Sequence, residues 1–216
     1  MDLVLGRAAV KSLLARTDDT RVDRQQIAES GVCDDAEVAR QIGDVISVAV
    51  RARSLPLLCG KVHVAIPALP QMTREEIQKV FPWKIREEKG IERDCAPTSA
   101  VTMILDTVMT DEDTGDYIAG SVYEQRLAAK LDIVLGLQQA IWLVEHQDEF
   151  PDLMALVGNP GPEFAAEFDC PGLVVVCGSG GRCIPYLGKQ DGRFVLDWHW
   201  VDDSFDRYGR IAVSGK

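Results

Sequence analysis

The sequence lacks several features that would each assign the protein to a class. It has no apolar run of the roughly 18 residues that a membrane-spanning helix needs. Its six cysteines are scattered, and no two are as close as the ligands of a structural zinc knuckle. Internal repeats and low-complexity segments are absent as well. We therefore expect neither a transmembrane protein, nor a disulfide scaffold, nor a repeat array.

The N-terminal segment, residues 1–16, is amphipathic, but it begins with an acidic residue, Asp2, and has no small-residue cleavage site. It predicts a surface helix rather than a signal peptide. Without an export signal the cysteines are expected to be reduced, which favours a cytoplasmic location.

Negative charge is concentrated in the second half of the chain. The net charge is −11, and residues 1–110 hold 15 Lys or Arg against 16 Asp or Glu. Of the totals of 23 and 34, residues 111–216 therefore hold 8 and 18, a net of −10. Such a half repels nucleic acid and anionic lipid, so we expect neither as a partner. The excess serves solubility, offers an acidic face to a basic protein partner, or mimics a phosphate backbone.

Apolar periodicity places helices first and strands last. It predicts an α+β fold, with a helical N-terminal region followed by a small C-terminal antiparallel sheet. One compact domain over residues 1–216 is expected, which allows a subdivision into a helical region, 1–54, and an α+β region, 61–216. Helices are expected over residues 3–15, 25–30, 36–50, 74–81, 96–109, 123–146 and 151–156, and strands over 61–66, 173–177, 183–187, 194–200 and, as an edge strand, 210–213.

Two local signals are specific. Thr73 and Glu76 have the spacing of a capping box at a helix start. Asp191-Gly192, between two strand-like runs, predicts a tight β-hairpin turn.

Cys95 lies where a helix is expected to begin. Pro97 suits a first helical turn, and Thr98 and Ser99 favour its start. The N–H groups and the positive dipole end at such a terminus stabilise a thiolate and lower its pKa, as in nucleophilic cysteines. The alternative is that Cys95 is a small hydrophobic residue at the start of a core helix.

The segment Asp94-Cys95-Ala96-Pro97-Thr98-Ser99, followed by an apolar stretch, resembles the nucleophile segment of papain-like cysteine peptidases that trim double-glycine leaders from bacteriocins. The buried strand at 173–177 and the later hairpin follow in the family's order. The resemblance implies a papain-like fold and peptidase activity with Cys95 as nucleophile. Three features depart from the family: Ala96 replaces a Gly, no His leads the strand at Leu173, and residues 91–93 contain no Gln.

His199 is the candidate to replace the missing base. It lies two residues after Asp197, so both side chains project from one face of a strand. The hydrolase hypothesis therefore has Cys95 as nucleophile, His199 as general base and Asp197 as the residue that orients it. It requires Cys95 to react with iodoacetamide faster than an ordinary thiol does.

Trp198 and Trp200 share the opposite face of the same strand, and Asp202 and Asp203 follow them. Two aromatic residues side by side on a strand are typical of a core. If that face meets solvent instead, these four residues form a binding platform flanked by acid.

Two further patterns are weaker signals, for a zinc site and for DNA binding. Cys170, Cys177, Cys183 and His199 could form a zinc set, but their spacing is loose, so no metal or cofactor is expected. The segment around Gly31 echoes a helix-turn-helix, whose recognition helix would open with acidic residues that repel phosphates.

The sequence thus supports two functions of different classes. The first is a non-enzymatic binding or regulatory module, whose acidic half meets a basic partner. The second is a papain-like cysteine hydrolase. The His base of the family and its Gln, which helps to build the oxyanion hole, are both missing from this sequence. Their absence favours the first function.

Overall fold

The structure is a computed structural model that describes residues 62–215 apart from 111, 114 and 159–164. The chain divides into two units, Met1–Ser54 and Leu55–Lys216, and the described residues all belong to the second. The three helices expected before residue 54 and the helix-turn-helix echo lie outside the described residues.

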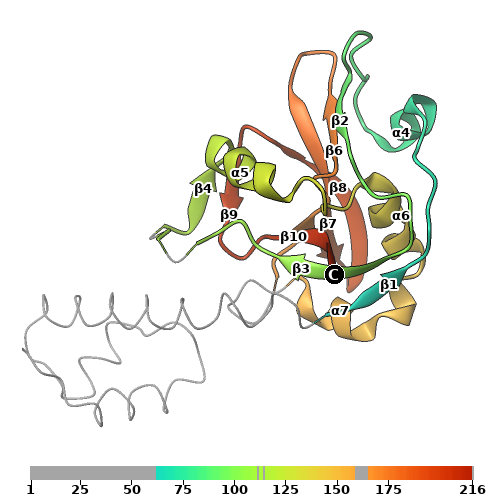
Figure 1. Ribbon diagram of the computed structural model, residues 1–216, viewed down its shortest axis with the longest axis vertical. Helices are drawn as coiled ribbons and strands as arrows, with labels where there is room; N and C mark the ends of the chain where they lie inside the picture. Colours follow the sequence, from blue (N-terminus) through green and yellow to red (C-terminus); the bar gives the residue numbers. More distant parts are fainter. Residues whose placement is uncertain (1–61, 111, 114, 159–164, 216) are drawn as a thin grey trace, which may run out of the picture. The chain divides into compact units, whose positions relative to one another are not determined.

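Short helices and many strands alternate along the described chain (Figure 1). In order they are β1 Val64–Ile66, α4 Arg74–Val80, β2 Ile91–Asp94, β3 Val101–Asp106, β4 Tyr117–Ala119, α5 Gly120–Leu127, η1 Ala128–Lys130, α6 Leu137–Glu145, η2 Gln147–Glu149, α7 Pro151–Leu156, β5 Phe168–Asp169, β6 Leu173–Val176, β7 Arg182–Gln190, β8 Arg193–Trp200, β9 Ser204–Asp206 and β10 Arg210–Gly215.

Eight strands form one mixed sheet in the order β1-β3-β10-β5-β7-β6-β2, with β8 paired to β7 off this path. The pairing of β10 with β5 is parallel and the others are antiparallel. Residues 182–183 of β7 pair with β6 and residues 186–187 pair with β5, while β8 pairs along 183–190. Since a strand has two edges, β5 and β6 share one edge of β7 and β8 occupies the other. The strands β4 and β9 form a separate two-stranded sheet.

The strand β8 is an outer strand of this sheet, because β7 is its sole strand partner among the described residues. Two of its backbone N–H groups bond to side chains instead of to a neighbouring strand. The N–H of Phe194 donates to Gln147 Oε1 at 2.7 Å, and that of Trp198 donates to Asp197 Oδ1 at 2.8 Å.

The predicted fold class is wrong, because the sheet extends from Val64 to Gly215 and the described helices are short. The clearest correction is at residues 101–106, expected as a helix and observed as β3. Met103 and Leu105 are buried there while Thr102 is exposed, which is the alternation of a strand. Three of these residues are β-branched, a composition that favours strands.

The long helix expected over 123–146 is also wrong, since it is two helices, α5 and α6, separated by the short helix η1, a turn and an extended stretch that begins at Val134. Between the two helices Leu135 N–H donates to Ala212 O (3.0 Å), and Ser214 N–H donates to Ile133 O (2.7 Å). The stretch therefore lies along β10, on the side of that strand opposite β3. That is a long-range pairing, which helical periodicity alone does not reveal.

Several local predictions are confirmed. Helix α4 has the capping box at Thr73, and Pro151 opens α7 at its first turn. The β7–β8 hairpin turns at Asp191 and Gly192, whose φ angles are 50° and 78°, as a type I′ turn requires. The strand expected over 210–213 is present as β10, but it lies between β3 and β5 rather than at an edge.

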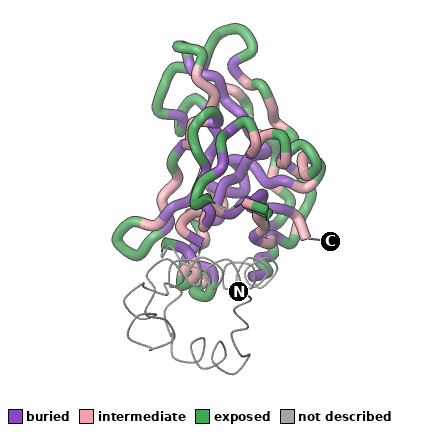
Figure 2. Tube along the Cα trace, turned by 90° about the vertical axis from the view of Figure 1, so that its left-hand side faces the viewer, coloured by how far each residue is buried: buried purple, intermediate pink, exposed green. Residues whose placement is uncertain are grey.

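Helices cover both faces of the sheet. On β10, Ala212 packs with residues of α6 and α7, whereas Ile211 and Val213 pack with residues of α5. Figure 2 shows the buried residues running through the middle of the described part, with exposed ones at the turns. None of the described helices is long and apolar enough to cross a membrane.

The capping box generates a stability prediction. Glu76 N–H donates to Thr73 Oγ1 (3.3 Å), and Thr73 N–H donates to Glu76 Oε2 (2.8 Å). Replacing Thr73 with Ala should lower the free energy of unfolding by about 1 kcal/mol in urea denaturation. The control is Thr98→Ala, at an exposed position outside any helix. An equal loss in both variants would contradict the role of the cap.

Candidate functional site

The two tryptophans at the end of β8 differ in burial: the first lies in the core and the second reaches the surface. Trp198 is buried, and its ring meets that of Phe81 edge-on, with centroids 4.7 Å apart. Trp200 is half-buried and lies 5.0 Å from the ring of Trp83, at an interplanar angle of 36°. Trp198 is therefore a core residue, as expected for neighbouring aromatic residues on a strand, whereas Trp200 reaches the surface; the binding platform stays a prediction.

Trp83 reaches this position because the turn after α4 is held at several points. The side chain of Gln78 spans the turn, with Nε2 donating to Trp83 O (2.9 Å) and Oε1 accepting from Ile85 N–H (2.8 Å). The chain then runs beside the end of β6, where Gly178 N–H donates to Lys84 O (2.8 Å). The backbone of Trp83 is thus fixed, although the residue is 40% exposed.

Trp200 lies close against the turn that joins β6 to β7. A Cβ at Gly181 would stand 2.2 Å from Trp200 Cζ3, so no other residue fits under the indole without a shift. We call Trp83 and Trp200 the tryptophan pair. Both members are positioned by backbone and packing before any partner arrives.

Two acidic residues lie in the turn directly after Trp200. Asp202 and Asp203 are exposed, and they lie in a turn closed by the bond from Asp203 N–H to Trp200 O (3.1 Å). The carboxylate of Asp202 is 3.8 Å from Arg182 Nη1. This distance, and an exposed fraction of 79% for the Asp202 side chain, leave the carboxylate largely in solvent.

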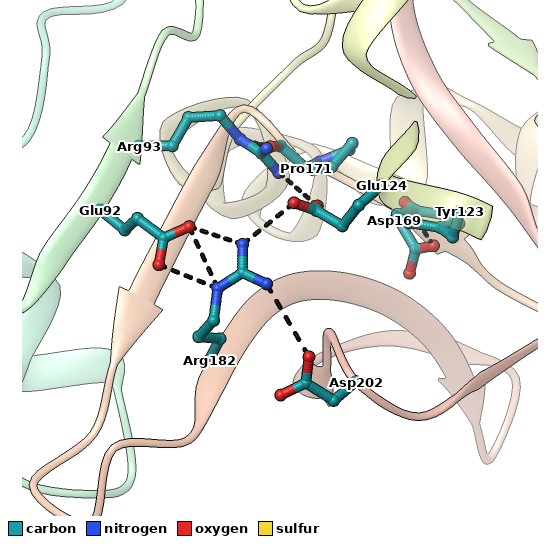
Figure 3. Close-up of polar contacts among 8 residues, drawn as sticks. All are labelled: Glu92, Arg93, Tyr123, Glu124, Asp169, Pro171, Arg182 and Asp202. Carbon is teal, nitrogen blue, oxygen red and sulfur yellow. Dashed lines mark hydrogen bonds and ion pairs between the residues drawn. The ribbon is translucent and has the colours of Figure 1, made fainter. Parts of the chain in front are cut away.

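Arg182 is the centre of a network that ties β2, β7 and α5 together (Figure 3). Its guanidinium donates to Glu92 (Nε to Oε2, 2.8 Å) and to Glu124 (Nη2 to Oε2, 3.0 Å). Glu124 also accepts from Arg93, at 3.2 Å. Two carboxylates therefore already neutralise Arg182, so the charge of Asp202 remains available to a partner.

His199, between the two tryptophans of β8, points to the other face of the sheet. Its Nδ1 lies 2.9 Å from Asp169 Oδ1, and its Nε2 lies 3.3 Å from Glu167 Oε1. The ring stacks on Tyr186, with centroids 3.8 Å apart and an interplanar angle of 13°. The ring of Phe205 packs edge-on against another side of the imidazole, with ring centroids 5.9 Å apart.

The carboxylate of Asp169 joins this cluster to the core. Its Oδ2 accepts from the buried hydroxyl of Tyr123 at 3.0 Å, and the ring of Tyr123 stacks on Phe205. The adjoining cavity, lined also by Glu167 and Arg210, has a volume of about 10 Å³. That is about the space one water molecule needs, so the cavity does not admit an organic substrate.

Charge around His199 changes the proton affinity of its neighbours. Burial alone would lower the pKa of His199, but the hydrogen bond and charge of Asp169 and the charges of Glu167 and Asp197 outweigh it and raise that pKa. Burial raises the pKa of Glu167, against the opposing effect of His199. Both groups therefore hold protons more tightly in the folded protein.

The structure places the three predicted catalytic residues in different settings. Cys95 follows β2 in an exposed loop that leads into a strand, so the expected helix terminus is absent. Although Cys95 is exposed, partial desolvation of its thiol raises the pKa of Cys95, which disfavours the thiolate. His199 faces Asp169 rather than Asp197, whose Oδ2 accepts from Tyr186 at 3.4 Å.

Both ring nitrogens of His199 already face carboxylates, so neither is directed to a thiol. The hydrolase therefore remains a prediction that the geometry around Cys95 does not favour. Within the described ranges no group of three or more His, Cys, Asp or Glu is placed to hold a metal ion.

Sequence reasoning missed Trp83, Glu167, Asp169 and Tyr186. One feature of the sequence could have pointed to Trp83: it is an aromatic residue directly after Phe81-Pro82, where the helix is expected to end. The other three reach their partners through strand pairing, which leaves no local pattern. No protein-family model matches the chain, and no curated protein or solved structure resembles it significantly.

The setting of Cys95 predicts an unreactive thiol. At pH 7 we expect iodoacetamide to alkylate Cys95 no faster than it alkylates the cysteine of glutathione, because the raised pKa leaves little thiolate. Peptide mass mapping after timed quenching measures the rate, with Cys95→Ser confirming the assignment. Alkylation of Cys95 tenfold faster than glutathione would restore the hydrolase hypothesis.

The raised pKa of His199 predicts how stability depends on pH. A group with a raised folded pKa contributes its full stability below its unfolded pKa, here 6.5, and loses it as the pH rises through the folded pKa. The free energy of unfolding should therefore fall between pH 6 and pH 9, and His199→Gln should flatten this slope. His63→Gln, on the exposed side of the chain before β1, should leave it unchanged.

Proposed function

We propose that this protein is a non-enzymatic binding module that recognises a basic partner protein through the tryptophan pair together with Asp202 and Asp203. One observation carries the proposal: Trp83 is 40% exposed, yet its turn is fixed by Gln78 and its ring rests on Trp200. An exposed tryptophan that is already ordered loses little entropy on binding, and such residues dominate the affinity of protein interfaces.

The charge of the surface supports a basic partner. Asp202 and Asp203 are exposed in the turn after Trp200, and residues 111–216 carry most of the chain's net negative charge. A Lys or Arg side chain can lay its aliphatic part, or its cationic group, on an indole face while its charge approaches a carboxylate. Opposite charges also accelerate association, and added salt weakens the complex.

An apolar or acidic partner fits this surface less well. An apolar partner would bury the two aspartates without a counter-charge, and an acidic one would meet like charge. The cysteine hydrolase gains no support from Cys95, where the thiol lies in a loop with a raised pKa.

The proposal predicts which peptides bind. A phage-displayed library of random dodecapeptides selected on the full chain should yield sequences with Lys or Arg beside a large apolar residue. Trp83→Ala should weaken the selected peptides at least tenfold, because it removes a central anchor. Asp202→Asn with Asp203→Asn should weaken them less and reduce their dependence on salt, as measured by isothermal titration calorimetry.

The matched control is Tyr117→Ala, which removes an exposed aromatic residue on β4 and should leave affinity unchanged. Equal affinity for wild type and Trp83→Ala, or selected peptides without basic residues, would exclude this function.

A further inference from the structure

The strand that carries Trp200 is held to the sheet in two ways. Backbone pairing with β7 is the first. The second is His199, which crosses over β7: it lies opposite Ile184 on that strand, whereas its partner Asp169 lies opposite Tyr186 on the strand's other edge. The contact therefore joins the outer strand β8 to β5 over the strand between them.

Acidic and aromatic groups face His199 from every element around it. They are Asp169 on β5, Glu167 just before it, Asp197 on β8, the ring and hydroxyl of Tyr186 on β7 and the ring of Phe205 on β9, with Asp206 acting on Glu167. A protonated imidazole has two N–H donors and serves both Asp169 and Glu167. A neutral one has a single donor, so one carboxylate loses its bond to the imidazole, and no positive charge then offsets the repulsion between the two carboxylates, although Asp169 keeps the bond from Tyr123.

We propose that His199 is a proton-operated latch: while it is protonated, it holds the end of β8 on the sheet and keeps Trp200 against Trp83 in the form that binds the partner. This inference rests on the proposed function, because the tryptophan pair is the site that the latch regulates. Trp200 is the next residue after His199, so any displacement of the latch moves it directly.

The direction of the control follows from the chemistry. Loss of the proton removes one hydrogen bond and one positive charge from a cluster of carboxylates, so the contact that joins the end of β8 to β5 is weakened. Partner affinity should be high at pH 6 and fall as the pH rises. The raised pKa of His199 places the change above the range of an ordinary histidine.

Three measurements on the full chain test the latch. The first is the pKa of His199, from the pH dependence of its ring proton resonances. The second is tryptophan emission, recorded in Trp142→Phe because Trp142 stacks on a different imidazole, that of His146. The third is the affinity of a selected dodecapeptide at pH 6 and pH 9.

The ring proton resonances, the tryptophan emission and the peptide affinity should all change over the same pH range. The affinity should be at least fivefold lower at pH 9 than at pH 6. His199→Gln should bind weakly at both values, and His63→Gln should behave as wild type. Tryptophan emission that ignores the titration of His199, or an affinity equal at pH 6 and pH 9, would overturn the latch. These two readouts are taken with His199 in place, so they decide the question even if His199→Gln fails to fold.

Failure of the latch is distinct from failure of the proposed function. If no peptide binds at any pH, the proposed function is wrong. The pH dependence of the tryptophan emission then tests the latch by itself. If a peptide binds with a pH-independent affinity, the function stands and the latch is wrong.

Discussion

The structure depends on the way β7 uses its two edges. One edge is divided between β6 and β5, so two branches of the sheet start from a single strand. The other edge holds β8 over most of its length. Side chains reinforce this junction: Arg182, at the start of β7, bonds to carboxylates of β2 and α5, and Tyr186 supports the ring of His199. The tryptophan pair and the carboxylate cluster around His199 both form where the branches meet.

The alternation of one strand separates two kinds of chemistry. Along β8 the side chains of Trp198 and Trp200 lie on one face and that of His199 on the other. One face is aromatic and partly open to solvent, and the other is a carboxylate cluster around an imidazole. Because the three residues are consecutive, the backbone itself connects the tryptophans on one face with the imidazole on the other.

Local signals in the sequence were reliable, and long-range ones were not. The capping box at Thr73 and the Asp191-Gly192 turn are each set by a few neighbouring residues, and both are present. The apolar stretch at 101–105 is compatible with a buried helix or a buried strand, and its pairing with β1 and β10 decides for the strand. The contacts of Trp83 and His199 likewise need the folded sheet. The sequence placed an acid beside His199, but strand pairing supplies a different one.

The outer edge of β8 has a consequence for self-association. An unpaired edge strand is a template on which a second copy of a chain can extend the sheet. Here the outward N–H groups of Phe194 and Trp198 are already occupied by Gln147 and Asp197. A docking strand would have to displace both side chains, and it would meet a carboxylate as it did so. At these two positions the outer edge of β8 is therefore closed to a second copy of the chain, even though the strand carries an exposed aromatic surface.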